Sequence, residues 1–99
     1  MAYDPGALDA ALAAAVGDEP GLIAELRHAF FSSADAHVAA LKSATSLADW
    51  QAAAQRLKGL AASFGARRLM DAASELIARA QIDPADLRKI ERVLAALAA

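Results

Sequence analysis

Apolar residues recur at three- and four-residue spacing along almost the whole chain, and this periodicity constrains the fold more than any other feature. Such spacing places apolar side chains on one face of an α-helix, whereas a half-buried strand needs strict alternation. Alanine, the residue that favours helix most, occurs 30 times in 99 residues and strengthens the prediction. No segment shows a competing strand pattern, so the chain is expected to be all-α.

Helix-starting and helix-ending residues divide this periodic sequence into five expected helices. Asp4 and Pro5 suit the beginning of the first helix, and Gly17 suits its end. Ser46, with Asp49 three residues later, resembles a capping box that opens the third helix. The expected helices cover about residues 4–17, 18–44, 46–64, 66–80 and 83–97. Because the connections are short, neighbouring helices should pack antiparallel within a single domain over residues 1–99.

Several features of the composition narrow the class of protein. The absence of cysteine excludes disulfides and thiolate chemistry, and the two histidines, His28 and His37, lie on different helix faces with no carboxylate pair spaced to join them. No metal or cofactor is therefore expected. The chain has no signal peptide and no long apolar run, which predicts a soluble, cytoplasmic protein without membrane insertion. Its net charge of −2 argues against a nucleic-acid partner.

The basic residues are unevenly distributed. Residues 50–70 contain Arg56, Lys58, Arg67 and Arg68 and no acidic residue, which gives this segment a charge of +4 and leaves −6 for the rest of the chain. We call these four residues the basic segment. Two interpretations remain open at this point. The segment is either a chance cluster on a solvated face or a docking patch for an acidic partner.

The two faces of the third helix differ in an unusual way. Apolar residues share one arc of its helical wheel and define the expected core face: Trp50, Ala53, Ala54, Leu57, Leu60, Ala61 and Phe64. The opposite face carries Gln55, Gly59 and Ala62, although glycine costs about 1 kcal/mol relative to alanine inside a helix. Either tight packing between helices at Gly59 or the close approach of a partner would explain the small residues.

The sequence Gln55-Arg56-Leu57-Lys58-Gly59, followed by Ala61-Ala62-Ser63-Phe64-Gly65-Ala66, resembles a known signalling motif. It is similar to the histidine-containing phosphotransfer (HPt) family, whose members read Ala-His-x-Leu-Lys-Gly here. The resemblance covers residues 22–76. It implies an all-α, antiparallel up-and-down four-helix bundle with an additional short N-terminal helix. It also implies that the protein takes part in a two-component phosphorelay rather than acting as an enzyme.

The resemblance assigns expected roles to individual residues. Lys58 would balance phosphate charge, Gly59 would leave clearance for a receiver domain, and Gly65 would form the turn into the next helix. The expected binding residues are Gln55, Arg56, Lys58, Gly59, Ala62, Arg67 and Arg68. The implied partners are a response-regulator receiver domain and a hybrid sensor kinase. Leu60 and Ile77 depart from the family pattern and make the site more apolar.

Gln55 occupies the position of the phosphoacceptor histidine. A neutral imidazole has a free nitrogen lone pair that can attack phosphorus, whereas the lone pair of an amide nitrogen is delocalised into its carbonyl. Gln55 can therefore form hydrogen bonds but should not carry a transferable phosphoryl group. His28 is expected to be a solvated surface residue, and His37 is expected at the boundary of the core.

Three functional hypotheses follow from these residues. The first is a degenerate HPt module that docks receiver domains without carrying phosphate on residue 55, expected mainly as a monomer. The second is a working phosphotransfer protein that uses another histidine, or whose native residue 55 is histidine. The third is a structural bundle that self-associates as a homodimer through the face of Gln55 and Gly59.

Overall fold

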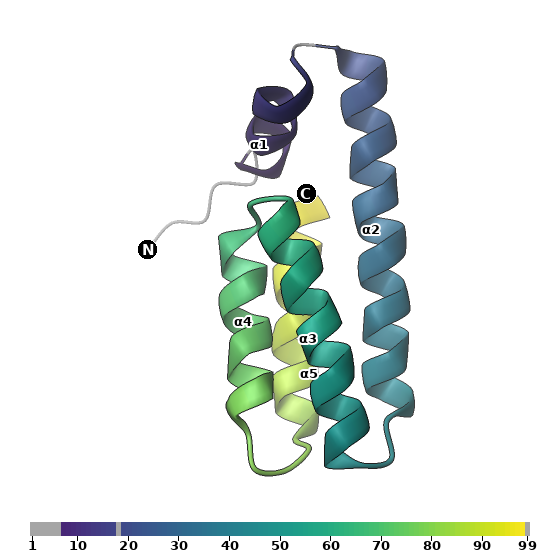
Figure 1. Cartoon of the computed structure of the whole chain (residues 1–99), viewed down its shortest axis with the longest axis vertical. Coiled ribbons are helices and arrows are strands. Elements are labelled where there is room, and N and C mark those ends of the chain that lie inside the picture. The colour runs from purple at the N-terminus through teal and green to yellow at the C-terminus, as the bar shows by residue number, and fades with distance from the viewer. Residues whose placement is uncertain (1–6, 18, 99) are drawn as a thin grey trace.

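The computed structural model describes residues 7–17 and 19–98, and this part of the chain is helical except for the short connections (Figure 1). The helices are α1 (Ala7–Val16), α2 (Pro20–Ser43), α3 (Leu47–Ser63), α4 (Arg67–Ala78) and α5 (Pro84–Ala98). The predicted number and order of helices are confirmed. The expected cap at Asp4 and Pro5 lies outside the described residues.

The helix ends follow the residues that the sequence analysis singled out. Ser46 precedes α3, and its hydroxyl oxygen accepts a hydrogen bond of 3.1 Å from the backbone N–H of Asp49. Gly17 and Gly65, with φ of +78° and +68°, adopt the left-handed conformation that lets the chain turn after α1 and α3. The fourth helix is shorter than expected, because Arg79 already has an extended backbone conformation.

The four helices α2 to α5 form an up-and-down bundle, and α1 lies across one end of it against α2 (Figure 1). At 1.5 Å per residue, the 24 residues of α2 span about 36 Å. This helix is longer than its neighbours, and its N-terminal part extends past the ends of α3 and α4 to meet α1 (Figure 1). The observed architecture is the expected bundle with an additional N-terminal helix.

The core contains the apolar stripes of all five helices. Its largest fully buried side chains are Trp50, Phe30, Leu8, Leu41, Leu57, Leu69, Leu76 and Ile90. Leu60 and Phe64, which were expected on the core face of α3, are only half-buried, and the apolar residue Leu22 of α2 is 38% exposed. Leu22 lies in the first turn of α2, where that helix has left the bundle and has fewer neighbours to pack against (Figure 1).

A buried carboxylate anchors the connection between α4 and α5. Asp86, in the first turn of α5, is 5% exposed and accepts two hydrogen bonds from the guanidinium of Arg79, at 3.0 and 3.1 Å. Such two-point pairing satisfies a carboxylate that would otherwise be costly to bury. This contact also explains why α4 ends before Arg79, since the side chain must reach across the turn to α5.

Candidate functional site

The middle of α3 divides into a buried and an exposed face, as the helical wheel predicted. Leu57 is fully buried in the core, whereas Gln55, Arg56, Gly59 and Ala62 are exposed. Lys58 is half-buried beside them. We call the surface formed by Gln55, Arg56, Lys58, Gly59 and Ala62 the α3 face. Five of the seven expected binding residues therefore share one surface.

Packing within the chain does not explain why residue 59 is glycine. A Cβ atom built on Gly59 would meet no heavy atom within 4 Å outside its own helix backbone and chain neighbours. The explanation by tight packing between helices is therefore wrong for the described residues. Glycine is unfavourable in a helix interior, and packing of the described residues around the Cβ position does not require it.

Gly59→Ala is expected to stabilise the isolated protein by roughly 0.5–1 kcal/mol, because alanine restricts the unfolded chain and favours helix without a clash. The free energy of unfolding from urea titrations measures this change directly. Ser63 donates its hydroxyl hydrogen bond of 3.0 Å to the carbonyl of Gly59, a backbone contact that the substitution preserves. A loss of stability in Gly59→Ala would show that the position is packed after all.

Gln55 projects from the α3 face without a hydrogen bond to another described side chain or backbone group. One turn earlier, Gln51 behaves differently, since its side-chain amide donates a hydrogen bond of 3.1 Å to the backbone carbonyl of Ile77. This contact ties α3 to the C-terminal end of α4. The sequence does not predict this contact, because a backbone carbonyl is the same acceptor in every residue type. The half-buried side chain of Ile77 is apolar and provides no amide at this place.

The basic segment does not form one patch. Arg56 and Lys58 belong to α3, whereas Arg67 and Arg68 begin α4. Arg68 lines two shallow grooves between α4 and α5 together with Lys89 of α5. The structure thus places Arg68 with α5 and not with Gln55. The expected grouping came from closeness in sequence, but the chain reverses direction at the turn at Gly65, and Arg68 then lies on the side of α4 that faces α5.

The two histidines lie where the sequence analysis expected them. His28 is exposed, and His37 is half-buried on α2 next to α3. Partial burial, and then the nearby positive charge of Arg56, lower the pKa of His37 from its ordinary value. The imidazole of His37 is consequently neutral at physiological pH.

This shift predicts how stability depends on pH. Because the pKa of His37 is lower in the folded state, the unfolded chain binds its proton first as the pH falls through about 6.5, and the folded state loses stability. His37→Gln should therefore lose less stability than the wild type between about pH 8 and pH 5 in urea titrations. His28→Gln, at an exposed position on the same helix, is the control for replacing a histidine by glutamine. Equal pH profiles for all three proteins would contradict the assignment.

Comparison with known proteins agrees with this arrangement of a helical bundle and an exposed motif helix. The model of the family described as the Hpt domain matches residues 25–99. The chain belongs to the Hpt domain family. The match covers most of α2 and all of α3 to α5 and leaves α1 outside. No curated protein and no solved structure was found to be significantly similar to the chain.

Membership in this family carries general functional meaning. Hpt domains are phosphotransfer modules rather than enzymes proper, they take part in two-component phosphorelay signalling, and they interact with response-regulator receiver domains. Among the described residues, no helix is both long enough and apolar enough to cross a membrane.

Proposed function

We propose that this protein is a degenerate HPt module that docks receiver domains through the α3 face without carrying phosphate on residue 55. The observation that carries the proposal is the open space beside Gly59. Glycine destabilises the helix and packing within the described bundle does not require it, so we attribute it to the close approach of an external partner. The side chain of Ala62 on the same surface is also small, so it does not obstruct a partner that approaches the exposed Gln55.

The chemistry of the α3 face suits recognition of a receiver domain better than transfer. Gln55 can donate and accept hydrogen bonds in the place of a neutral histidine, but its amide nitrogen is not a nucleophile. Arg56 and Lys58 flank it with positive charge, which complements an acidic receiver pocket. The protein would then act as an adaptor, a sequestering factor or a competitor within a phosphorelay.

The remaining parts of the proposal concern the setting of the protein. We place it in the cytoplasm, as a monomer whose single HPt-like domain spans residues 1–99, with a hybrid sensor kinase as a further partner. Arg67, at the start of α4, is proposed to add positive charge at the edge of the docking surface. Arg68 is left out, because it lines grooves on the α5 side of α4.

Gln55→His is expected to restore phosphotransfer. The substitution places an imidazole nucleophile on an exposed helix face beside Lys58, where a docked receiver would present its aspartyl phosphate. Radiolabelled phosphate should pass from a phosphorylated receiver to Gln55→His and should not pass to the wild-type protein. The measurement is acid-labile label on the HPt band after electrophoresis.

The same experiment tests a second candidate function, which is phosphotransfer through another histidine. His37 favours it to a limited extent, since its lowered pKa keeps the imidazole neutral. Label on the wild-type protein that disappears in His37→Ala, and persists in His28→Ala, would replace the proposal with this candidate. Absence of label on both the wild type and Gln55→His would argue against docking of that receiver.

A further inference from the structure

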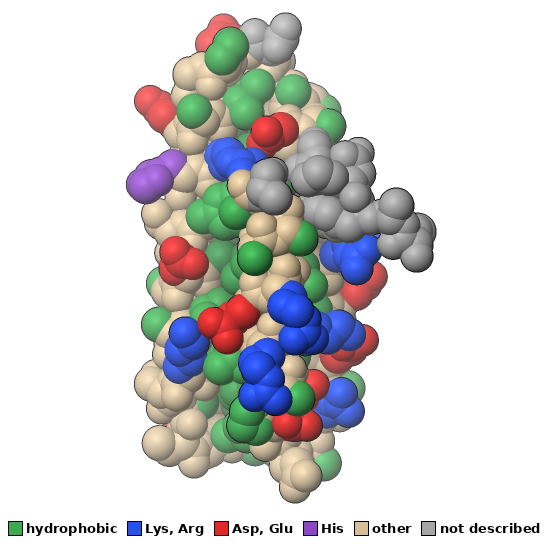
Figure 2. All heavy atoms as spheres, turned by 180° about the vertical axis from the view of Figure 1, so that it is seen from behind, with side chains coloured by type: hydrophobic (Ala, Val, Ile, Leu, Met, Phe, Trp, Pro, Cys, Tyr) green, Lys and Arg blue, Asp and Glu red, His purple; other side chains and the backbone are tan. Residues whose placement is uncertain are grey.

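A second charged surface lies on the side of the bundle away from α3. Figure 2, which views the molecule from behind, shows Lys and Arg side chains gathered over the middle of that side. A groove of about 220 Å³ between α4 and α5 lies in this region, lined by Arg68, Lys89, Arg92, Val93 and Ala96. The described residues that line it are cationic or apolar. We call it the α4–α5 groove.

The spacing of the groove residues follows one face of α5. Lys89, Arg92, Val93 and Ala96 stand at positions i, i+3, i+4 and i+7, so their side chains lie in one stripe along the helix. Arg68 reaches the same groove from α4. The small side chain of Ala96 and the half-buried Val93 form an apolar floor between the cations. A partner would therefore meet positive charge at the sides and a low apolar strip between them.

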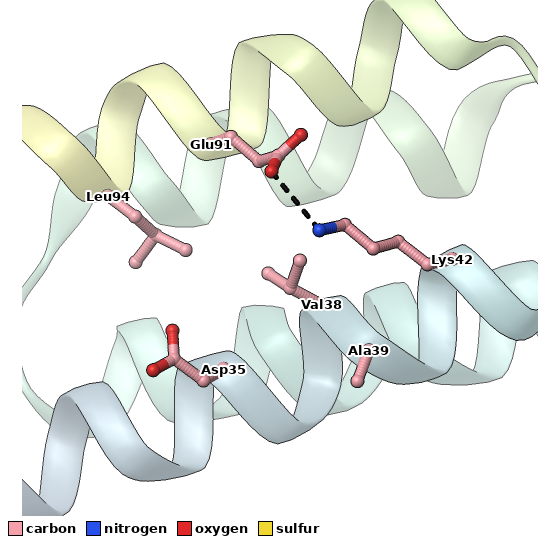
Figure 3. A pocket seen from close by; sticks show the side chains of 6 residues that line it. All are labelled: Asp35, Val38, Ala39, Lys42, Glu91 and Leu94. Carbon is pink, nitrogen blue, oxygen red and sulfur yellow. Dashed lines mark ion pairs between the residues drawn. The ribbon is translucent and has the colours of Figure 1, made fainter.

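Acidic residues border this groove and limit the extent of the positively charged surface. On the α4 side, Glu75 accepts a hydrogen bond of 2.6 Å from Lys89, and it lines an adjoining groove of about 310 Å³ with Asp71. On the α2 side, Glu91 points towards Lys42 across the gap between α5 and α2, at 3.4 Å (Figure 3). Among the described residues, none forms an ion pair with Arg92.

We propose that the α4–α5 groove is a second docking surface and that it binds an acidic helix of a partner protein. One row of carboxylates at helical spacing would match the narrow stripe of cations, and the apolar strip would accept small side chains between them. A nucleic acid fits less well, because its broad field of phosphates would meet Asp71, Glu75 and Glu91 at the borders.

This surface does not depend on the α3 face, since the two lie on different helices of the bundle. With one binding surface, a module that docks a receiver without transferring phosphate can sequester the receiver or compete for it, but it cannot link it to another protein. Two surfaces on different sides would let it hold a receiver and an acidic partner together. The second surface therefore gives the proposed adaptor a means of linking two proteins.

The probe for this groove is a synthetic helical peptide of alanine with glutamates at every fourth position, compared with the same peptide carrying glutamines. Titration into the nitrogen-15-labelled full chain should give saturable shifts of the amides of Lys89, Arg92 and Val93 with the glutamate peptide only. Arg92→Glu should weaken binding about ten-fold or more, because it replaces a cation that has no partner within the described bundle by a carboxylate. Circular dichroism checks that this exposed substitution leaves the helices intact.

The matched control is Arg56→Glu, the same substitution on the α3 face, which should leave the affinity for the glutamate peptide within about two-fold. Equal binding of both peptides, no binding of either, or unchanged affinity in Arg92→Glu would overturn the proposal. Binding of a short DNA duplex at Lys89 and Arg92 in place of the peptide would also overturn it. Receiver binding is measured separately, so failure of this surface is distinguishable from failure of the α3 face.

Discussion

Gly59→Arg should abolish receiver binding, with a loss of affinity of about 100-fold or more, while the helical fold stays intact. The added side chain has room at its base, because no heavy atom of the described residues outside the local helix backbone lies within 4 Å of the Cβ position. Arginine also has a higher helix propensity than glycine, so stability should not fall. At an interface, however, the long side chain would hold the partner away from Gln55. Isothermal titration calorimetry with a receiver domain measures the loss.

The chain offers a matched control for this experiment. Gly21, in the first turn of α2, is also exposed, and no heavy atom of the described residues lies within 4 Å of a Cβ built on it. Gly21→Arg adds the same side chain and the same charge in the first turn of α2, which is not part of the α3 face. It should bind the receiver like the wild type. If Gly59→Arg bound as tightly as Gly21→Arg, the α3 face would not be the docking surface.

Trp50→Ala should destabilise the protein by about 3–5 kcal/mol, the range expected for truncating a buried aromatic residue. Trp50 is the largest fully buried side chain, 1% exposed, and it fixes the first turns of α3 against the core. A domain of this size has a total stability of about 5–15 kcal/mol, so the variant should be partly unfolded or close to it. The urea midpoint followed by circular dichroism measures the change.

Trp50→Phe separates packing from hydrogen bonding at the same position. The indole Nε1 of Trp50 is buried and has no hydrogen-bond partner among the described residues, so phenylalanine removes an unsatisfied donor as well as some volume. The two effects oppose each other, and the net change should stay below about 1.5 kcal/mol. A loss in Trp50→Phe as large as that in Trp50→Ala would mean that Nε1 makes a stabilising contact.

Most of the fold could be predicted from the sequence because its signals are local. Ser46 and Gly65 mark the ends of α3 through capping and turn geometry, which depend on neighbouring residues alone. The errors have a non-local cause. Leu22 is exposed because α2 extends past the bundle, and α4 ends early because Arg79 bonds to Asp86 in the next helix. Neither the length of a neighbouring helix nor a contact across a turn appears in helical periodicity.

The candidate site was predictable to a similar extent. Periodicity separated Leu57 from Gln55 and Gly59 correctly, since inward and outward positions follow from the helix period. It could not decide whether Gly59 was packed, because that depends on atoms of other helices. Closeness in sequence, and not periodicity, grouped Arg68 with the residues of α3, whereas the structure places Arg68 beside Lys89. Closeness in sequence is a poor guide across a turn between antiparallel helices.

The most direct test of the central proposal is a titration of the nitrogen-15-labelled protein with receiver domains, in the presence and absence of a phosphoryl mimic. The account predicts chemical-shift changes centred on Gln55, Lys58, Gly59 and Ala62, with the amides of Lys89 and Arg92 unaffected by the receiver. Absence of shifts with every receiver tested, or shifts confined to residues outside the α3 face, would contradict it.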